Sequence, residues 1–406
     1  MKKFYRPVCI LLMVVMIAGC GSAGKAGSGS ALSVSTPSAA RSVAQSTAQS
    51  MVQSAAQSAT QSAAKSAAAS SATSSSAGLF AYERLNTKEK AVYDAMESAM
   101  VNHQNKVPVE TLSDDDMKKV FNFVLYDHPE IFWCTSSVRH SLKYSDGTIK
   151  TEFEPQYSMT KEERYEYKER IDREVSSWMA AVPSDASDYD KAKILFDTIV
   201  ANVEYDEASD NNQNIVSVFV NHRSVCKGYA RAYQYLLSKA GIESTIVEGS
   251  AEGMPHAWNL VKLDGEYYHF DVTWGDPAFS SNNNIDDFIN YSYFGVTTKE
   301  ILKKHTIDAD MVLPECTAVK DNYFVHEGLY FEDKNPAVVG DAIYNGDVKR
   351  QKFISLRFKT DELYQWAKDY FITKQNLFKF YTSSRGIFMY NNDELFIISI
   401  IREKGE

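Results

Sequence analysis

Residues 224–230 read Ser-Val-Cys-Lys-Gly-Tyr-Ala and open an apolar pattern of helical period that ends at Gly241. Further along the chain, residues 256–259 read His-Ala-Trp-Asn and residues 271–277 read Asp-Val-Thr-Trp-Gly-Asp-Pro. Glycine commonly follows the last turn of a helix, so Gly241 marks the end of a predicted helix that begins at Cys226. The three blocks therefore place a cysteine, a histidine and an aspartate on neighbouring regular elements.

Three strands are predicted after this helix, because apolar and aromatic residues alternate there between turn signals. The turn Asp264-Gly265 is typical of a tight hairpin between the last two strands. The order of a helix followed by an antiparallel sheet indicates an α+β fold. The predicted strands are Ser244–Glu248, His256–Leu263 and Glu266–Trp274.

A cysteine in the first turn of a helix has a special chemical environment. The first N–H groups of a helix have no carbonyl partner within it, and the helix dipole places positive charge at this end. Both effects stabilise a thiolate, and a neighbouring imidazolium adds to them. Cys226 is therefore the candidate nucleophile.

Two histidines follow on the predicted strands, His256 and His269. Across the hairpin, Asp271 on the returning strand is expected to lie roughly opposite His256. His269 and Asp271 are two residues apart and share a face of their strand, so His269 is a candidate supporting group. In this arrangement Cys226 attacks, His256 exchanges the proton and Asp271 fixes the imidazole tautomer.

The blocks around Cys226, His256 and Asp271 resemble the core of the transglutaminase-like superfamily, and the resemblance extends from Ile194 to Pro277. It implies a papain-like α+β core, with helices packed on an antiparallel sheet, and it assigns these three residues as the catalytic triad. It also implies acyl transfer through a thioester, to an amine in cross-linking members or to water in amidase and peptidase members. No cofactor is expected.

Two further roles stay open. The backbone N–H of Cys226 can donate to an oxyanion, and the side chain of Tyr205 upstream is the candidate for a second donor, with a structural aromatic residue as the alternative. Asn259 either orients ring groups near the site or caps its strand.

The N-terminus predicts the location of the protein. Lys2, Lys3 and Arg6 precede an apolar run over residues 8–17, and small residues then lead to Cys20. This pattern is typical of a secretory signal peptide and is too short for a membrane span. It also resembles the lipobox of bacterial lipoproteins, which implies lipidation of Cys20 and anchoring to the extracytoplasmic face of the cell membrane. An ordinary secreted protein is the alternative.

Composition and charge limit the partners. Residues 21–78 are almost entirely Ser, Ala, Gly, Thr and Gln, which predicts a disordered tether. The first 78 residues hold six of the 43 basic residues and none of the 53 acidic ones, so residues 79–406 carry a formal net charge of −16. Such a body is a poor binder of nucleic acid. A protein or peptide substrate is expected, with cell-wall peptide as one candidate.

The remaining cysteines give no metal motif. After Cys9 and Cys20 are accounted for, Cys134, Cys226 and Cys316 remain, and an odd number leaves at least one thiol free or paired between molecules. A bridge between Cys134 and Cys316 is possible. The chain contains no CxxC or HExxH motif, so no metal site is expected.

Composition and periodicity divide the chain into five parts, and the flanking parts have their own predicted elements. Asn86 and Ser113 begin helices, a third helix ends before Pro183, and a hairpin turns around Asp146-Gly147. A helix is also predicted from Thr360 to Phe371. Strands are predicted at Tyr323–Phe331, Lys352–Phe358, Leu377–Tyr381 and Leu395–Ile401. The parts are a signal peptide (1–20), the tether (21–78), a mostly helical region (79–187), a transglutaminase-like catalytic domain (188–312) and a small α+β accessory domain (313–406).

The preferred function is that of a lipid-anchored extracytoplasmic cysteine enzyme that transfers acyl groups from protein or peptide amides. A peptidase or amidase acting on wall peptide uses the same chemistry with water as acceptor. The third hypothesis is a binding or adhesion scaffold without catalysis. Reactivity of the Cys226 thiol separates the third hypothesis from the first two, and amine incorporation separates the first from the second.

Overall fold

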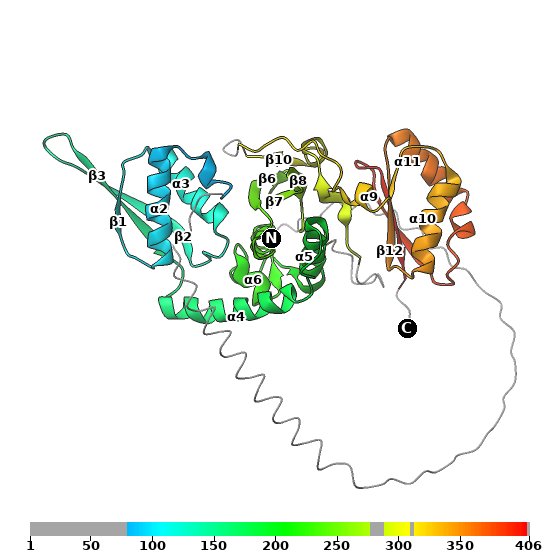
Figure 1. Ribbon diagram of the computed structural model, residues 1–406, viewed down its shortest axis with the longest axis horizontal. Helices are drawn as coiled ribbons and strands as arrows, with labels where there is room; N and C mark the ends of the chain where they lie inside the picture. Colours follow the sequence, from blue (N-terminus) through cyan, green and yellow to red (C-terminus); the bar gives the residue numbers. More distant parts are fainter. Residues whose placement is uncertain (1–78, 277–287, 309–311, 404–406) are drawn as a thin grey trace, which may run out of the picture. The chain divides into compact units, whose positions relative to one another are not determined.

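The computed structural model describes residues 79–276, 288–308 and 312–403 (Figure 1). The predicted signal peptide, the predicted lipid site Cys20 and the predicted tether lie outside these residues. The described residues combine helices with mainly antiparallel sheets, which confirms the predicted α+β class. None of the helices in the described ranges has the length and apolar character that a membrane span requires.

The first folded region packs helices against a small antiparallel sheet with strand order β1-β3-β2. Asn86 accepts the N–H groups of Lys88 and Glu89, and the Glu89 carboxylate accepts the N–H of Asn86, so the predicted helix start is confirmed as a capping box. Ser113 caps the second helix, also as predicted. The elements are η1 (Tyr82–Arg84), α2 (Thr87–Val101), β1 (Val107–Val109), α3 (Asp114–Asp127), β2 (Cys134–Lys143), β3 (Ile149–Tyr157) and α4 (Lys161–Met179).

The central region holds a five-stranded antiparallel sheet of order β10-β6-β7-β8-β9. Helix α7 packs against β6 and β7 and also contacts α5 and α6. The predicted helix start at Cys226 is confirmed. The elements are α5 (Asp188–Asn202), β4 (Glu204–Tyr205), α6 (Ile215–Phe219), β5 (Arg223–Ser224), α7 (Cys226–Lys239), β6 (Ser244–Ala251), β7 (Met254–Leu263), β8 (Glu266–Phe270), η2 (Tyr291–Tyr293), β9 (Phe294–Val296), α8 (Thr298–Ile301) and β10 (His305–Ile307).

The hairpin between β7 and β8 sets the register of the sheet. Asp264 and Gly265 both have positive φ angles, of 49° and 89°, as the predicted two-residue turn requires. This turn pairs Leu263 with Glu266 and Asn259 with Phe270, and β8 ends at Phe270. Continued by one pair, the same register would place Asp271 opposite Trp258. The expectation that Asp271 lies opposite His256 was therefore wrong by two residues, and the two side chains meet diagonally after the strand has ended.

The C-terminal region has a four-stranded sheet of order β11-β12-β14-β13, with α10 and α11 packed against β12 (Figure 1). Strand β11 runs parallel to β12, and the other pairs are antiparallel. Its elements are α9 (Tyr323–His326), β11 (Tyr330–Phe331), α10 (Pro336–Val348), β12 (Phe353–Phe358), α11 (Asp361–Ala367), η3 (Lys368–Thr373), η4 (Asn376–Lys379), β13 (Ile387–Asn392) and β14 (Ile397–Arg402).

Two strand predictions in this region were wrong. Residues 323–331 begin with α9, because Asn322 accepts the N–H of Phe324 as a helix cap and Gly328, with φ +68°, ends the turn before the short strand β11. Residues 377–381 belong mainly to the 3₁₀ helix η4, since Leu377 and Tyr381 are four residues apart and are both buried. Helix α10 and strand β13 were not predicted, although Asn335 before Pro336 is a regular helix start.

Candidate active site

Cys226 is the first residue of α7, and its side chain is half-buried. The residue before the helix, Val225, offers no side chain that could cap the first N–H groups, so these donors point out of the helix end without a capping oxygen. Gly228 makes this position possible. A Cβ atom there would lie 2.0 Å from Ser224 Oγ and 2.8 Å from the Asn212 carbonyl oxygen. The glycine thus lets the start of α7 pack closely on the segment before it.

The two-stranded pair β4–β5 brings Tyr205 next to the start of α7. Tyr205 pairs with Ser224, two residues before Cys226, and its ring centroid lies 6.4 Å from that of Tyr229 on α7. The candidate second oxyanion donor is therefore close to the helix end in the fold. The contact with Tyr229 also agrees with the structural alternative.

His256 connects the thiol to Asp271. Its Nε2–H donates to Asp271 Oδ2 over 2.8 Å, and the Cys226 thiol takes part in a further hydrogen bond with this histidine. Because Nε2 is used by Asp271, Nδ1 is the ring nitrogen left for Cys226. Burial alone would lower the pKa of His256, but the charge of Asp271 and the hydrogen bonds to Asp271 and Cys226 raise it to about 10. At neutral pH His256 is thus an imidazolium, which is the partner a thiolate requires.

Asp271 is fully buried and held from several sides. Its Oδ1 accepts the backbone N–H of Trp274 over 3.1 Å, and its own backbone N–H donates to the carbonyl of Tyr293 over 3.0 Å. Burial alone would raise the pKa of Asp271, but the charges and hydrogen bonds of His256 and His305 hold it well below its usual range. The residue is therefore a carboxylate in a site that excludes water.

His305 is a member of the site that was not predicted from the sequence. It begins β10, is 1% exposed, and its Nε2 lies 3.0 Å from the same Oδ2 of Asp271 that His256 contacts. No motif marks it, since it lies 34 residues after Asp271 and only the pairing of β10 with β6 brings it to the site. The only available hint was a histidine before a short alternating run.

Aromatic rings cover the imidazole of His256. Trp258 stacks on it at 6.2 Å between ring centroids with an interplanar angle of 21°, and Trp274 lies at 6.0 Å. The side chain of His256 keeps an exposed fraction of 8%. The site thus limits water at the imidazole while the thiol next to it remains half-exposed.

His269 lies behind Trp258. Its Nδ1 accepts the indole N–H of Trp258 over 3.1 Å, and its Nε2 lies 3.3 Å from Thr298 Oγ1. Burial, with a smaller effect of the His305 charge, lowers the pKa of His269 to about 3, so it is neutral. The predicted supporting residue therefore contacts the indole that stacks on His256.

Asn259 is three residues beyond His256 and points to the opposite face of β7. Its Nδ2 donates to the carbonyl of Ala230 on α7 over 2.9 Å. Of the two predicted roles, the structure thus gives a tie between strand and helix, and it places this amide on Ala230 rather than on the ring groups of the site.

The other two cysteines differ from Cys226. Cys134 and Cys316 are both buried and free, so the possible bridge between them is not formed. Burial raises the pKa of the Cys134 thiol to about 12 and that of the Cys316 thiol to about 11. Both are therefore protonated and inaccessible near neutral pH.

One group of potential metal ligands occurs in the described ranges. Ligand atoms of His256, Asp271 and His305 all lie within 4.8 Å of one another. The two histidine–carboxylate distances, 2.8 and 3.0 Å, are those of direct hydrogen bonds. A metal ion would have to replace both of these bonds, so hydrogen bonding accounts for the group.

Comparisons with known proteins agree with the location of this site. The model of the transglutaminase-like superfamily matches residues 177–272. Kyphoscoliosis peptidase of Mus musculus is 23% identical over 128 residues, which cover 27% of this chain and 19% of that protein. The chain thus spans less than a fifth of the length of this curated relative.

Two solved structures are similar to parts of the chain. The crystal structure of a TGase is 16% identical in sequence, and the match covers 44% of this chain and 53% of that chain, with a TM-score of 0.25. A candidate cysteine protease from Cytophaga hutchinsonii is 16% identical and covers 34% of this chain and 62% of its own, with a TM-score of 0.22. The family match confirms the resemblance seen in the sequence, and residues 177–272 of this chain are a domain of the transglutaminase-like superfamily.

Proposed function

We propose that this chain is a cysteine enzyme of the transglutaminase-like type, which transfers acyl groups from protein or peptide amides through a thioester on Cys226. The observation that carries the proposal is the connected set of Cys226, His256 and Asp271, with the thiol at the open end of α7 and the carboxylate 2.8 Å from the imidazole. Cys226 supplies the nucleophile, His256 exchanges the proton and Asp271 orients the imidazole, which are the three functions that a site of this type needs.

In the first half-reaction, the Cys226 thiolate attacks the carbonyl carbon of the amide, and the carbonyl electron pair moves to oxygen. The N–H of Cys226 at the start of α7 donates to this oxyanion. The His256 imidazolium then gives its proton to the amide nitrogen, the carbon–nitrogen bond breaks and an amine leaves. The acyl group remains on sulfur as a thioester.

In the second half-reaction, water or a primary amine gives a proton to neutral His256 and attacks the thioester. The carbon–sulfur bond breaks and the thiolate returns. Asp271 holds the His256 Nε2–H throughout, which keeps Nδ1 directed at the reacting atoms. Water as acceptor makes the chain a peptidase or amidase, and an amine makes it a cross-linking enzyme.

Selective thiol labelling tests this proposal without a known substrate. Iodoacetamide at neutral pH should alkylate Cys226 much faster than Cys134 or Cys316, because only Cys226 is accessible and paired with an imidazolium. The Cys226→Ala variant should lose this label and any acyl-enzyme found by mass spectrometry. Equal labelling of the three cysteines in the folded wild type would favour a scaffold without catalysis.

The acceptor is decided by a second assay. Peptide and wall-peptide substrates, incubated with and without a labelled primary amine, should give either amine incorporation or free acid, and both products should vanish in Cys226→Ala. Amine incorporation favours cross-linking. Free acid in the presence of amine favours hydrolysis.

Tyr205 is proposed as the second oxyanion donor, because β4–β5 pairing aligns it with Ser224 beside the helix end. Tyr205→Phe keeps the ring and removes the hydroxyl. We expect turnover to fall by roughly 10²-fold while the alkylation rate of Cys226 stays unchanged. Unchanged turnover would mean that Tyr205 has only a structural role.

Lipid anchoring at Cys20 on the extracytoplasmic face of a bacterial membrane is also proposed, on the sequence that precedes this cysteine. The net charge of −16 on residues 79–406 favours basic or neutral peptides as substrates, and wall peptide stays one candidate. In cells fed a labelled fatty acid, the wild-type protein should carry the label and remain in the membrane fraction. The Cys20→Ser variant should lose the label and leave the membrane fraction. Label on that variant would exclude Cys20 as the lipid anchor.

A further inference from the structure

His305 is engaged through both of its ring nitrogens. Nε2 lies 3.0 Å from Asp271 Oδ2, and Nδ1 lies 3.2 Å from the carbonyl oxygen of Ile301, the last residue of α8. The ring is fully enclosed, with a side-chain exposure of 0%. Water therefore cannot replace either contact.

Both of these partners are hydrogen-bond acceptors. A backbone carbonyl has no proton to donate, and Asp271 is a carboxylate because its surroundings hold its pKa well below the usual range. Neutral imidazole carries one N–H and would turn a lone pair toward one of the two oxygens. Only the imidazolium donates from both nitrogens, so the geometry assigns the charged form to His305.

Three aromatic rings surround this imidazole and suit a cation. The ring centroids of Trp258, Trp274 and Tyr293 lie 5.0, 4.8 and 5.1 Å from that of His305. The negative faces of aromatic rings attract cations at such distances. A buried cation also needs a counter-charge, which Asp271 supplies in direct contact.

Among the other titratable groups around the ring, the His256 imidazolium opposes a second positive charge, because its ring lies at 5.5 Å. Burial keeps His269 neutral by lowering its pKa to about 3, and burial keeps Tyr293 neutral by raising its pKa above its usual range. The neighbouring Lys304 has its charge matched by Glu252 and Glu394. With a Cys226 thiolate, the site thus contains two cations and two anions.

We propose that His305 is a positioning residue, an imidazolium that holds Asp271 in place and balances its charge so that His256 can release its proton as well as keep it. The proposal rests on the proposed function. An uncompensated Asp271 would stabilise protonated His256 further, and the second half-reaction requires neutral His256. His305 thus acts on the chemistry through Asp271.

The first test uses the wild-type full chain with ¹⁵N-labelled histidine. His305, assigned by its loss in His305→Gln, should show a proton on both ring nitrogens near neutral pH. A single protonated ring nitrogen on His305 would overturn the proposal. This measurement does not depend on whether any variant is active.

The second test compares two variants in the iodoacetamide assay of Cys226 over a range of pH, with thermal melting to show that each is folded. His305→Leu removes both donors and the charge, and the alkylation rate at neutral pH should fall by about tenfold to a hundredfold, the usual contribution of a hydrogen bond to a charged group. His305→Gln keeps an N–H toward Asp271 and should recover most of the rate. The alkaline limb of its rate–pH profile should move to higher pH, because the His305 cation that opposes protonation of His256 is gone.

A matched control is His326→Leu, which removes a histidine that lies 3.4 Å from Asp321 in another part of the fold. Its rate and pH profile should equal those of the wild type. A wild-type profile in His305→Leu, or a rate in His305→Gln as low as in His305→Leu, would overturn the positioning role in favour of simple packing. If wild-type Cys226 reacts no faster than Cys134, the proposed function itself fails, which is a different result.

Discussion

Two buried carboxylates, one in the central region and one in the C-terminal region, are satisfied in similar ways but have different partners. Asp271 accepts hydrogen bonds from two imidazoles and from the backbone of Trp274. Asp347 on α10 accepts from Arg402 and from Thr382 and Ser383. Both carboxylates have pKa values below the usual range, despite burial, because these donors and charges favour the ionised form.

The difference lies in what the partner can do with a proton. The guanidinium of Arg402 stays charged over the whole accessible pH range, so its pair with Asp347 can only hold the fold together. An imidazole can gain or lose a proton near neutral pH, so its pair with Asp271 can take part in chemistry. A buried carboxylate is therefore a functional candidate only when its partner is titratable and reaches a reactive group.

The largest expected effect is that of Asp271→Asn. The amide keeps the size of the side chain but can direct an N–H at His256 Nε2, which favours the wrong tautomer. We expect turnover to fall by about 10⁴-fold, as in comparable triads, with a modest loss of stability. Steady-state kinetics and a thermal melt measure the two quantities. If the loss of stability accounts for the whole loss of turnover, Asp271 would be a structural carboxylate like Asp347.

The pH dependence of stability should sharpen the same comparison. The pKa of His256 is raised from 6.5 to about 10, so its pair with Asp271 stabilises the fold fully below pH 6.5 and loses this contribution as the pH rises through 10. Relative to Asp271→Asn, the wild type should therefore lose on the order of a few kcal/mol across this window. Urea titrations at several pH values measure it. A constant difference between the two proteins would show that His256 does not titrate against Asp271.

Asp347→Asn should have the opposite profile. Removing the charge that Arg402 faces should cost about 2–3 kcal/mol of unfolding free energy, while activity per folded molecule stays unchanged. The pKa of Asp347 is depressed, so the wild type should lose this advantage as the pH falls below the usual range of a carboxyl group. Asp369→Asn, in an exposed pair with Lys374, is the control and should have little effect.

The sequence predicted the central region well because local signals and the fold agree there. The helix start at Cys226, the stop at Gly241 and the turn at Asp264-Gly265 each follow from backbone chemistry that acts within a few residues. The same reasoning failed for Leu377–Tyr381, where aromatic and apolar residues favoured a strand but a spacing of four residues fits a helical turn. Propensity gave the wrong answer where tertiary packing decided the conformation.

His305 could not be predicted for a different reason. It reaches Asp271 through the pairing of β10 with the edge of β6, a contact between distant parts of the chain that leaves no fixed spacing in the sequence. Cys226, His256 and Asp271 were found because each lies in a short sequence block, residues 224–230, 256–259 and 271–277, that resembles the transglutaminase-like core.

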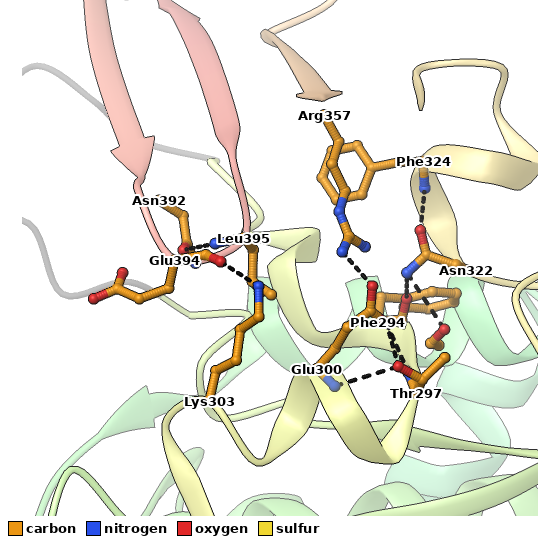
Figure 2. Close-up of polar contacts among 11 residues, drawn as sticks. Phe294, Thr297, Glu300, Lys303, Asn322, Phe324, Arg357, Asn392, Glu394 and Leu395 are labelled. Atoms are coloured by element: carbon orange, nitrogen blue, oxygen red, sulfur yellow. Dashed lines mark hydrogen bonds and ion pairs between the residues drawn. The ribbon is translucent and has the colours of Figure 1, made fainter. Parts of the chain in front are cut away.

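The smallest expected effect concerns a contact that joins the two regions. Arg357 on β12 pairs with Glu300 on α8, and Glu300 also accepts the N–H and hydroxyl of Thr297 as the cap of this helix (Figure 2). Helix α8 ends at Ile301, whose carbonyl accepts from His305. The C-terminal sheet thus supports the helix on which the His305 ring rests.

Glu300→Gln tests this support with the least disturbance, because glutamine can still accept from Thr297 in a capping box while the charge facing Arg357 is lost. We expect a loss of about 1–2 kcal/mol in unfolding free energy and a decrease of roughly fivefold or less in the alkylation rate of Cys226. Glu332→Gln makes the same chemical change in an exposed pair with Lys359; it should alter the unfolding free energy by no more than about 0.5 kcal/mol and leave the alkylation rate unchanged. If Glu300→Gln lowers stability but leaves the alkylation rate and its pH profile unchanged, the C-terminal region supports the fold without influencing the site. A lower rate with an unchanged melt would mean that the position of α8 is transmitted to Asp271 through His305, and that the chemistry depends on a contact between two residues outside the site that are 57 positions apart in sequence.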